Sequence, residues 1–187
     1  MKSPFFFIVE PLNGKRYNNT KEIGGVEFIT STSEEDHKFS NREAKVIETP
    51  IDYNGPIKKG DILLVHHNVF KFYNDIKGNR KSGRSFFKGN LFFVEPDQFF
   101  LYHNGEEWKT YDRYCFVKPI EKTESYLYKN VNEEPLVGLV KYPNEYLISK
   151  GVRKGDAVTF KPSSEYEFEV DGEKLYRMYD HQITMIL

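Results

Sequence analysis

Residues 78–85 imitate a phosphate-binding loop. They read Gly-Asn-Arg-Lys-Ser-Gly-Arg-Ser, so glycines, cations and a hydroxyl stand close to P-loop spacing, with an arginine in the lysine position. A P-loop needs a helix directly after it, because the amides of the first helical turn hold the phosphate. Here Phe86-Phe87 and then residues 91–93 follow, and they indicate a strand. The stretch therefore predicts a solvated basic hairpin and argues against a nucleotide site.

The cations of this hairpin support a second chemistry. Basic side chains interleaved with aromatic rings can grip single-stranded nucleic acid by charge and base stacking. The candidate residues are Lys77, Arg80, Lys81 and Arg84, beside Phe86 and Phe87. The whole chain, however, balances 27 Lys and Arg against 28 Asp and Glu. We therefore expect neither nucleic acid nor an anionic membrane as the main partner, and nucleic-acid or anion binding at these four cations stays an alternative.

The histidines do not form a metal-binding pattern. His66 and His67 stand at the end of an expected strand, where neighbouring side chains face opposite sides of a sheet, so the pair is not expected to chelate one ion. Zinc would also require Cys or His partners at Cys-x-x-Cys or His-Glu-x-x-His spacing. The remaining candidates are scattered along the sequence: His37, His103, His181 and Cys115. We expect no metal.

Nucleophilic catalysis is not indicated either. Cys115, the single cysteine, stands between Tyr114 and Phe116, and a thiol in an apolar strand is usually a small buried hydrophobe. Ser, His and Asp residues lack the surroundings of a nucleophile elbow.

The apolar run at residues 3–8 is too short for a signal peptide or a spanning helix. The sequence thus predicts a cytoplasmic protein that is not an enzyme and uses no cofactor.

An internal duplication provides the elements that would position these side chains. Three blocks recur in order, residues 8–12 as 116–120, 58–62 as 153–157, and 91–94 as 175–178. The offset between the copies shortens at each block, so the first copy holds one extra segment before Lys58 and another before Leu91. We expect two domains, residues 1–105 and 106–187. Function is expected in the extra segments, because long loops in compact domains are usually functional or disordered.

Short runs rich in Phe, Val, Ile and Tyr, broken by Asn-Gly, Gly-Asp and Pro, indicate an all-β fold. Strands are expected at residues 5–10, 44–48, 61–66, 69–73, 91–94, 99–102, 114–119, 137–141, 156–161, 166–170, 174–178 and 182–187. Asp171-Gly172 is the strongest hairpin signal, because both central residues of a type I′ turn need positive φ.

Residues 13–41 are the least strand-like part of the chain. They combine Asn-Asn, Gly-Gly, a Ser/Thr cluster and an acidic run, so we expect this segment to be mobile. Embedded in it is Gly24-Gly25-Val26-Glu27-Phe28-Ile29, where two glycines free the backbone and three apolar side chains have no evident core to enter. We interpret this tip as a docking element. The alternative is that it forms one more permanent strand.

In this order the motifs resemble those of the GroES co-chaperonin family. The family has a first strand, a mobile Gly-Gly loop with an apolar tripeptide, a Lys-x-Gly-Asp strand start and an acidic turn before the closing strand. The matching segments are 6–10, 24–28, 44–47, 58–63 and 95–99 in the first copy, and 136–140, 152–158 and 173–183 in the second. The resemblance covers most of the chain.

The resemblance implies two tandem GroES-like β-barrels, the first with a long mobile loop and a long basic hairpin. It further implies a homo-oligomeric ring that caps the cylinder of a GroEL-like chaperonin large subunit and assists ATP-dependent folding. Val26, Phe28 and Ile29 would enter an apolar groove of that subunit, with Glu27 at its rim as a specificity element. Because ordering a flexible loop costs free energy, only several loops on one ring would bind usefully.

Two other functions stay open. The chain could be a structural or assembly module, of cellular or viral origin, that buries its aromatic surface in a fixed complex. It could also be a nucleic-acid-binding β-barrel that uses residues 77–87. A ring that binds a chaperonin only with nucleotide would favour the co-chaperonin interpretation. A monomer that shifts single-stranded DNA would favour the nucleic-acid-binding barrel.

Overall fold

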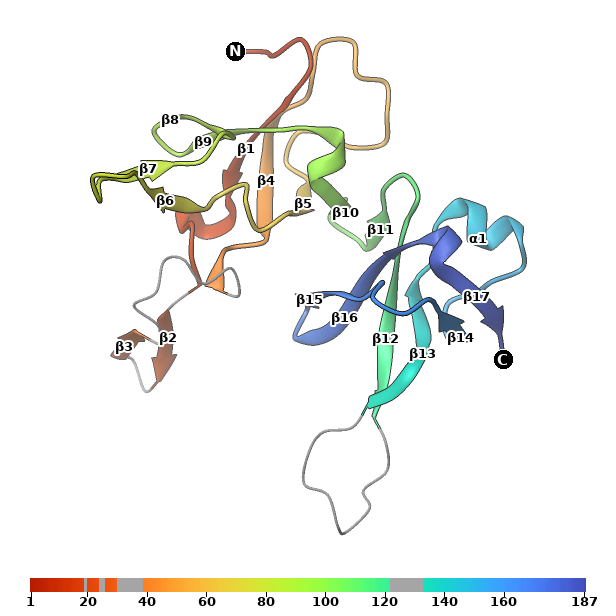
Figure 1. Cartoon of the computed structure of the whole chain (residues 1–187). Coiled ribbons are helices and arrows are strands. Elements are labelled where there is room, and N and C mark those ends of the chain that lie inside the picture. The colour runs from red at the N-terminus through yellow and green to blue at the C-terminus, as the bar shows by residue number, and fades with distance from the viewer. Residues whose placement is uncertain (19, 24–25, 30–38, 122–132) are drawn as a thin grey trace. The chain divides into compact units, whose positions relative to one another are not determined.

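The computed structural model describes residues 1–18, 20–23, 26–29, 39–121 and 133–187 (Figure 1). Strands dominate these residues, and the α-helix α1 (Glu145–Ser149) is short. The all-β prediction is confirmed. Helix α1 begins where the Asn144 side chain accepts a hydrogen bond from the backbone N–H of Leu147, and five residues are too few to show a helical period in the sequence.

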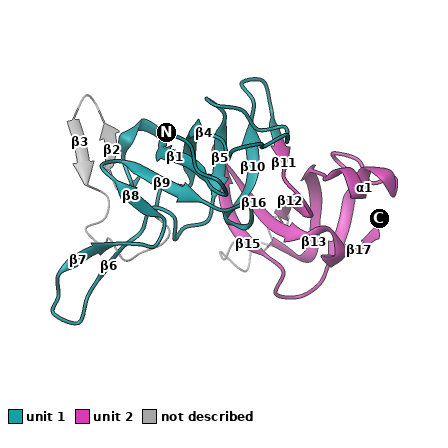
Figure 2. Cartoon of the chain, turned by 90° about the horizontal axis from the view of Figure 1, so that it is seen from above, with its two compact units in different colours: residues 1–108 teal, residues 109–187 magenta. Residues whose placement is uncertain are grey.

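The chain forms two compact units (Figure 2). Unit 1 runs from Met1 to Trp108 and unit 2 from Lys109 to Leu187, whereas the duplication predicted a boundary between residues 105 and 106.

Unit 1 is built on a seven-stranded antiparallel sheet with the order β11-β10-β5-β4-β1-β9-β8. Its strands are β1 (Phe7–Pro11), β4 (Glu43–Glu48), β5 (Ile62–Val65), β8 (Phe86–Lys88), β9 (Leu91–Val94), β10 (Phe99–His103) and β11 (Trp108–Thr110), of which β11 begins at the last residue of unit 1 and continues past the boundary. Two small hairpins stand outside this sheet. They are β2 (Thr20–Ile23) with β3 (Val26–Ile29), and β6 (Phe72–Asn74) with β7 (Arg80–Ser82).

Unit 2 is built on a six-stranded sheet with the order β15-β16-β12-β13-β14-β17. Its strands are β12 (Tyr114–Glu121), β13 (Glu133–Tyr142), β14 (Ala157–Phe160), β15 (Tyr166–Val170), β16 (Glu173–Tyr179) and β17 (Ile183–Ile186). The hairpin expected at Asp171-Gly172 is confirmed, since it joins β15 to β16 with φ of 52° and 74° at its two central residues.

The two large sheets repeat one another strand by strand. Strands β8, β9, β1, β4, β5 and β10 correspond to β15, β16, β12, β13, β14 and β17. The register repeats as well: Val9 lies opposite Val46 and Phe92, and Val117 lies opposite Val140 and Tyr176. A register irregularity precedes Val9 in β1 and Val117 in β12. The duplication seen in the sequence is therefore a duplication of backbone pairing.

The repeated Gly-Asp turn shows why the sequence block was kept. In unit 1 the Asp61 carboxylate accepts the Lys58 backbone N–H at 2.8 Å, and in unit 2 Asp156 accepts that of Arg153 at 2.7 Å. Gly60 has φ of 98° and Gly155 of 92°, a conformation that side chains rarely allow. Each aspartate thus closes a turn whose bend requires the preceding glycine.

The closing turn before the last paired strand is also repeated. A single 3₁₀ turn, Pro96–Gln98 in unit 1 and Asp180–Gln182 in unit 2, ends in a glutamine. The side-chain oxygen of Gln98 accepts the Glu95 N–H at 3.0 Å, and that of Gln182 accepts the Tyr179 N–H at 2.7 Å. These glutamines fix the path of the chain into β10 and β17.

Each unit buries its own core. In unit 1 the rings of Phe7 and Phe99 meet edge to face at 5.4 Å, and those of Phe70 and Phe92 at 4.8 Å. In unit 2 the core gathers aliphatic and sulfur side chains from the sheet and α1: Cys115, Val117, Val140, Leu147, Val152, Val158, Phe160 and Met178.

The expected barrels do not appear as closed sheets. Within the described ranges, the strand pairing of each large sheet ends at its outer strands, β11 and β8 in one and β15 and β17 in the other. The tandem GroES-like barrel architecture therefore stays a prediction, whereas the duplicated antiparallel sheet is observed.

One expected strand differs from the structure. Residues 69–73 were predicted to be a strand, but only Phe72–Asn74 pairs, in a separate hairpin. Val69 and Phe70 are fully buried in an irregular segment before it. These two side chains pack into the core of unit 1 although their backbone is not part of a β-strand. Sequence periodicity alone does not distinguish a buried irregular segment from a buried strand.

Candidate functional site

The segment predicted to be mobile, residues 13–41, has ends that are held by unit 1. Tyr17 forms an isolated antiparallel bridge with Ser40, and both side chains are buried. The N–H of Asn18 donates to the carbonyl of Phe39 at 2.7 Å. These terminal residues thus pair with each other as a stem, and the mobility expected for residues 13–41 stays a prediction. Residues 19, 24–25 and 30–38 lie outside the described part of the chain.

Asn41 fastens the base of this stem. Its side-chain amide donates to the carbonyls of Leu12 at 3.0 Å and Lys15 at 2.8 Å, and its side-chain oxygen accepts the N–H of Glu43 at 2.9 Å. Asn41 is 3% exposed. One buried side chain therefore connects the end of β1 to the start of β4, where the segment leaves and re-enters the sheet.

The expected docking residues Val26, Glu27, Phe28 and Ile29 form strand β3. Within the described ranges it pairs with β2 and with no strand of either large sheet, and the register places Val26 opposite Ile23 and Phe28 opposite Lys21. Gly24 and Gly25, the other two predicted residues, lie outside the described residues. The chain at this point is thus a hairpin between β1 and β4 and not an added strand of the large sheet.

The two extra segments of the first copy contact each other. Arg16 and Tyr17 precede β2, whereas Phe72 and Ser82 belong to the β6–β7 hairpin. Arg16 donates to the Ser82 hydroxyl at 3.1 Å, the Phe72 N–H donates to the Tyr17 hydroxyl at 2.8 Å, and the rings of Tyr17 and Phe72 stack 5.9 Å apart. With Arg80 these residues form what we call the insert junction: Arg16, Tyr17, Phe72, Arg80 and Ser82.

Two guanidinium groups lie over one ring in the insert junction. The Arg16 guanidinium carbon is 3.9 Å from the centre of the Phe72 ring, and that of Arg80 is 3.6 Å from it. Burial lowers the pKa of Arg16, and the charge of Arg80 lowers it further against the opposing effect of Tyr17. Arg16 Nη2 is buried without a hydrogen-bond partner. The junction therefore holds concentrated positive charge and an unused donor.

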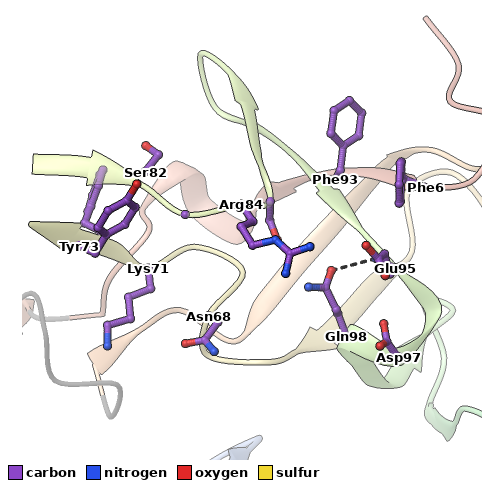
Figure 3. A pocket seen from close by; sticks show the side chains of 13 residues that line it. Phe6, Asn68, Lys71, Tyr73, Ser82, Arg84, Phe93, Glu95, Asp97 and Gln98 are labelled. Carbon is purple, nitrogen blue, oxygen red and sulfur yellow. Dashed lines mark hydrogen bonds between the residues drawn. The ribbon is translucent and has the colours of Figure 1, made fainter. Parts of the chain in front are cut away.

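An open groove of about 820 Å³ extends beside the insert junction. Its lining combines aromatic, basic and acidic residues of β6, β7, β9, the 3₁₀ turn and the segments next to these elements: Phe6, Asn68, Lys71, Phe72, Tyr73, Ser82, Gly83, Arg84, Ser85, Phe93, Glu95, Asp97 and Gln98. In Figure 3 the Arg84 side chain reaches into the middle of the groove, with Lys71 and Tyr73 on one side of it and Glu95 and Gln98 on the other.

The four predicted cations separate into different places. Arg80 lies in the insert junction and Arg84 in the groove, whereas Lys77 stands in the exposed β6–β7 turn and Lys81 lies opposite Tyr73 in that hairpin. Sequence reasoning missed Arg16 and Phe72. The extra segments were visible in the sequence, but their contact with each other was not.

The P-loop imitation is a hairpin, as expected. Asp75 closes the turn by accepting the backbone N–H groups of Lys77 and Asn79, each at 2.9 Å, and Arg80–Ser82 continues as strand β7. Strand β8 (Phe86–Lys88) follows residues 78–85 directly, so the stretch lacks the first helical turn whose amides would hold a phosphate.

The expectation that His66 and His67 face opposite sides is wrong. Strand β5 ends at Val65, so both histidines lie in the following turn, where their rings are 4.1 Å apart. Asn68 donates its backbone N–H to His66 Nδ1 at 3.2 Å. Among the residues with described side chains, no group of three or more His, Cys, Asp or Glu gathers as a metal site.

Cys115 is fully buried in β12, as expected. Burial is the main cause that raises the pKa of its thiol to about 12, and the nearby Asp180 charge adds to this effect. The thiol is therefore protonated at neutral pH and is a packing group in the core of unit 2 rather than a nucleophile.

A buried ionic network distinguishes unit 2. The Asp180 carboxylate, whose side chain is fully buried, pairs with Arg113 and accepts a hydrogen bond from Asn144 Nδ2 at 2.9 Å. Burial alone would raise the pKa of Asp180, but the hydrogen bonds from Arg113 and Asn144 outweigh it and lower that pKa. Because Asn144 also caps α1, the network ties the closing turn to the helix.

None of the helices among the described residues is long and apolar enough to cross a bilayer. No protein-family model matches the chain, and no curated protein matches it.

Proposed function

We propose that the chain is a non-enzymatic co-chaperonin-like protein that docks on a GroEL-like large subunit through Val26, Phe28 and Ile29. The observation that carries the proposal is the place of β3. It belongs to a hairpin inserted between the first two strands of a duplicated sheet, and in the part of the chain that the structure describes it pairs with neither large sheet. The order of motifs that resembles the GroES family supports the same location for a docking element.

The stem supports this proposal mechanically. Tyr17, Ser40 and Asn41 hold both ends of the inserted segment against unit 1, so the hairpin is presented from a fixed base. A fixed base limits the volume that the apolar tip explores and raises its effective concentration at a neighbouring site. A ring of such chains would add several weak contacts into useful avidity.

Glu27 gives the docking element a means of discrimination. In the hairpin it lies opposite Glu22, and a carboxylate between apolar anchors is costly in an unmatched apolar groove. A large subunit with an Arg or Lys at the rim would accept it. We propose that Glu27 selects the matched chaperonin.

Capture of the large subunit tests the proposed function. The double variant Val26→Ser/Phe28→Ser removes two anchors worth roughly 1.5–3 kcal/mol each when buried in a complex, so capture with ATP should be lost. Tyr73→Ser is the matched control, because Tyr73 is an exposed aromatic residue of the other small hairpin. The same capture by both variants as by the unmodified chain would overturn the proposal.

A further inference from the structure

We propose that the insert junction and the adjoining groove bind single-stranded nucleic acid, independently of chaperonin docking. The chemistry is that of phosphate groups held by arginine and lysine, with bases stacked on exposed aromatic rings.

The segment that carries the β6–β7 hairpin, residues 71–88, is strongly positive. Residues 71–88 contain a single carboxylate, Asp75, which the backbone N–H groups of its own turn engage. They contain six cations: Lys71, Lys77, Arg80, Lys81, Arg84 and Lys88. The net charge of the whole chain is nevertheless close to zero, because the compensating acidic residues lie elsewhere in the sequence. Affinity for a polyanion depends on the local cluster and not on the net charge.

Arg16 adds a further cation to the insert junction, and one of its donors has no partner among the described residues. Its Nη1 donates to the neutral hydroxyl of Ser82, and its Nη2 is buried without an acceptor. A buried guanidinium nitrogen without a partner is costly, so Arg16 adds positive charge beside the groove rather than a direct phosphate contact. The guanidinium is also held over the Phe72 ring, so its orientation is set before any ligand arrives.

Exposed aromatic rings lie beside these cations. Tyr73 is 52% exposed and lines the groove with Phe72, whereas Phe86 and Phe87 are exposed on β8. A base stacked on such a ring needs no specific edge contact, so binding would tolerate any sequence. The carboxylates of Glu95 and Asp97 line another part of the groove, and Figure 3 shows them on the side away from Lys71 and Tyr73. They would direct phosphates towards Lys71 and Arg84.

The aromatic component favours nucleic acid over an acidic peptide. An acidic peptide would use the same cations but would gain little from Tyr73. A single strand would use both, so loss of charge and loss of the ring should each weaken binding, and only loss of charge should change the salt dependence.

Fluorescence anisotropy of a labelled 20-nucleotide oligothymidylate with the full chain tests the proposal at two salt concentrations. Arg80→Gln/Arg84→Gln should weaken binding roughly tenfold and reduce the salt slope by about 1.4, the change expected for two lost phosphate contacts. Tyr73→Ala should weaken binding by roughly 5- to 150-fold with an unchanged slope. Lys154→Gln/Lys161→Gln removes the same charge from exposed positions of unit 2 and should bind as the unmodified chain does.

Three results would overturn the proposal. The first is no binding of the oligonucleotide at low salt. The second is equal weakening by the unit 2 control, which would indicate unspecific charge. The third is full competition by polyglutamate at equal charge together with no effect of Tyr73→Ala, which would assign the site to acidic peptides. None of these readouts involves a chaperonin, so failure here leaves the proposed docking of β3 untouched.

Discussion

The two copies of the sheet share a backbone and differ in the side chains that cover it. Phe6 and Phe93 of unit 1 pack their rings 5.6 Å apart, and the equivalent positions of unit 2 hold Tyr114 and Arg177, with the guanidinium carbon 5.1 Å from the ring. Pro96 of the closing turn corresponds to Asp180, the buried carboxylate of unit 2. The two units thus share strand register and turns, but at these equivalent positions unit 1 has apolar side chains where unit 2 has polar or charged ones.

The copies also differ in what is inserted between their strands. Unit 1 carries the β2–β3 and β6–β7 hairpins, which meet at the insert junction. Strand β14 of unit 2, which corresponds to β5, is followed by a short connection to β15. Both proposed binding functions therefore belong to unit 1, and unit 2 provides the reference against which each can be tested.

The largest expected difference concerns Asp180. Asp180→Ala leaves Arg113 and the buried Asn144 amide without their acceptor, and unit 2 should lose about 2–4 kcal/mol of unfolding free energy. Pro96→Ala at the equivalent, exposed position of unit 1 should cost less than about 1 kcal/mol. Denaturant-dependent hydrogen exchange, followed by mass spectrometry, reports each unit separately. Equal losses of unfolding free energy in the two variants would contradict a stabilising role of the Asp180 network in unit 2.

The next effect concerns the stem. Asn41→Ala removes the donor for the buried carbonyls of Leu12 and Lys15, and unit 1 should lose about 1–3 kcal/mol. Limited proteolysis within residues 13–41 should become faster. Asn90→Ala, which removes one exposed hydrogen bond to Gly14, is the control and should change neither measurement appreciably. Unchanged proteolysis in Asn41→Ala would show that the stem does not depend on this side chain.

A smaller and symmetric effect is expected at the repeated Gly-Asp turns. Gly60→Ala and Gly155→Ala each place a side chain at positive φ, where no atom lies within 4 Å of the added carbon, so strain alone costs about 1–2 kcal/mol. Each unit should be destabilised by its own variant to the same extent. A clear inequality between the two would mean that the turns are equivalent in shape but not in energy.

The smallest effect is the response to acid. Because the pKa of Asp180 is lowered in the folded state, its stabilisation is complete above the unfolded pKa of about 3.9 and is lost as the pH falls through the folded value. Unit 2 should therefore become less stable below about pH 4, and Asp180→Asn should reduce this dependence. If unit 2 of the Asp180→Asn variant loses the same stability at low pH as the unmodified chain, the loss is due to other carboxylates.

The sequence predicted the parts of the fold that depend on local chemistry. Blocks such as Lys58–Ile62 were recognisable because glycine and aspartate are needed at fixed places in the turn, and residues 91–94 and 166–170 were identified with their observed bounds. Short strands such as β7 and β11 were missed, because three residues carry no period.

The candidate site was less accessible from sequence. Lys77, Arg80, Lys81 and Arg84 were seen as one basic cluster, but the structure separates them and joins Arg80 to Arg16, which lies far away in the chain. Contacts between two inserted segments depend on the tertiary path of both. The duplication indicated where the segments were inserted, and only the three-dimensional structure indicates what they build together.

Native mass spectrometry of the purified chain, mixed with the GroEL-like chaperonin of the organism that encodes it, is the most direct test of docking through β3. We expect a ring of this chain that joins the chaperonin cylinder when ATP is present and leaves it when ATP is removed. We also expect that Val26→Ser/Phe28→Ser abolishes the complex while Tyr73→Ser retains it. A chain that never joins the cylinder in any nucleotide state, or that joins it equally well with both anchors removed, would rule out docking through β3.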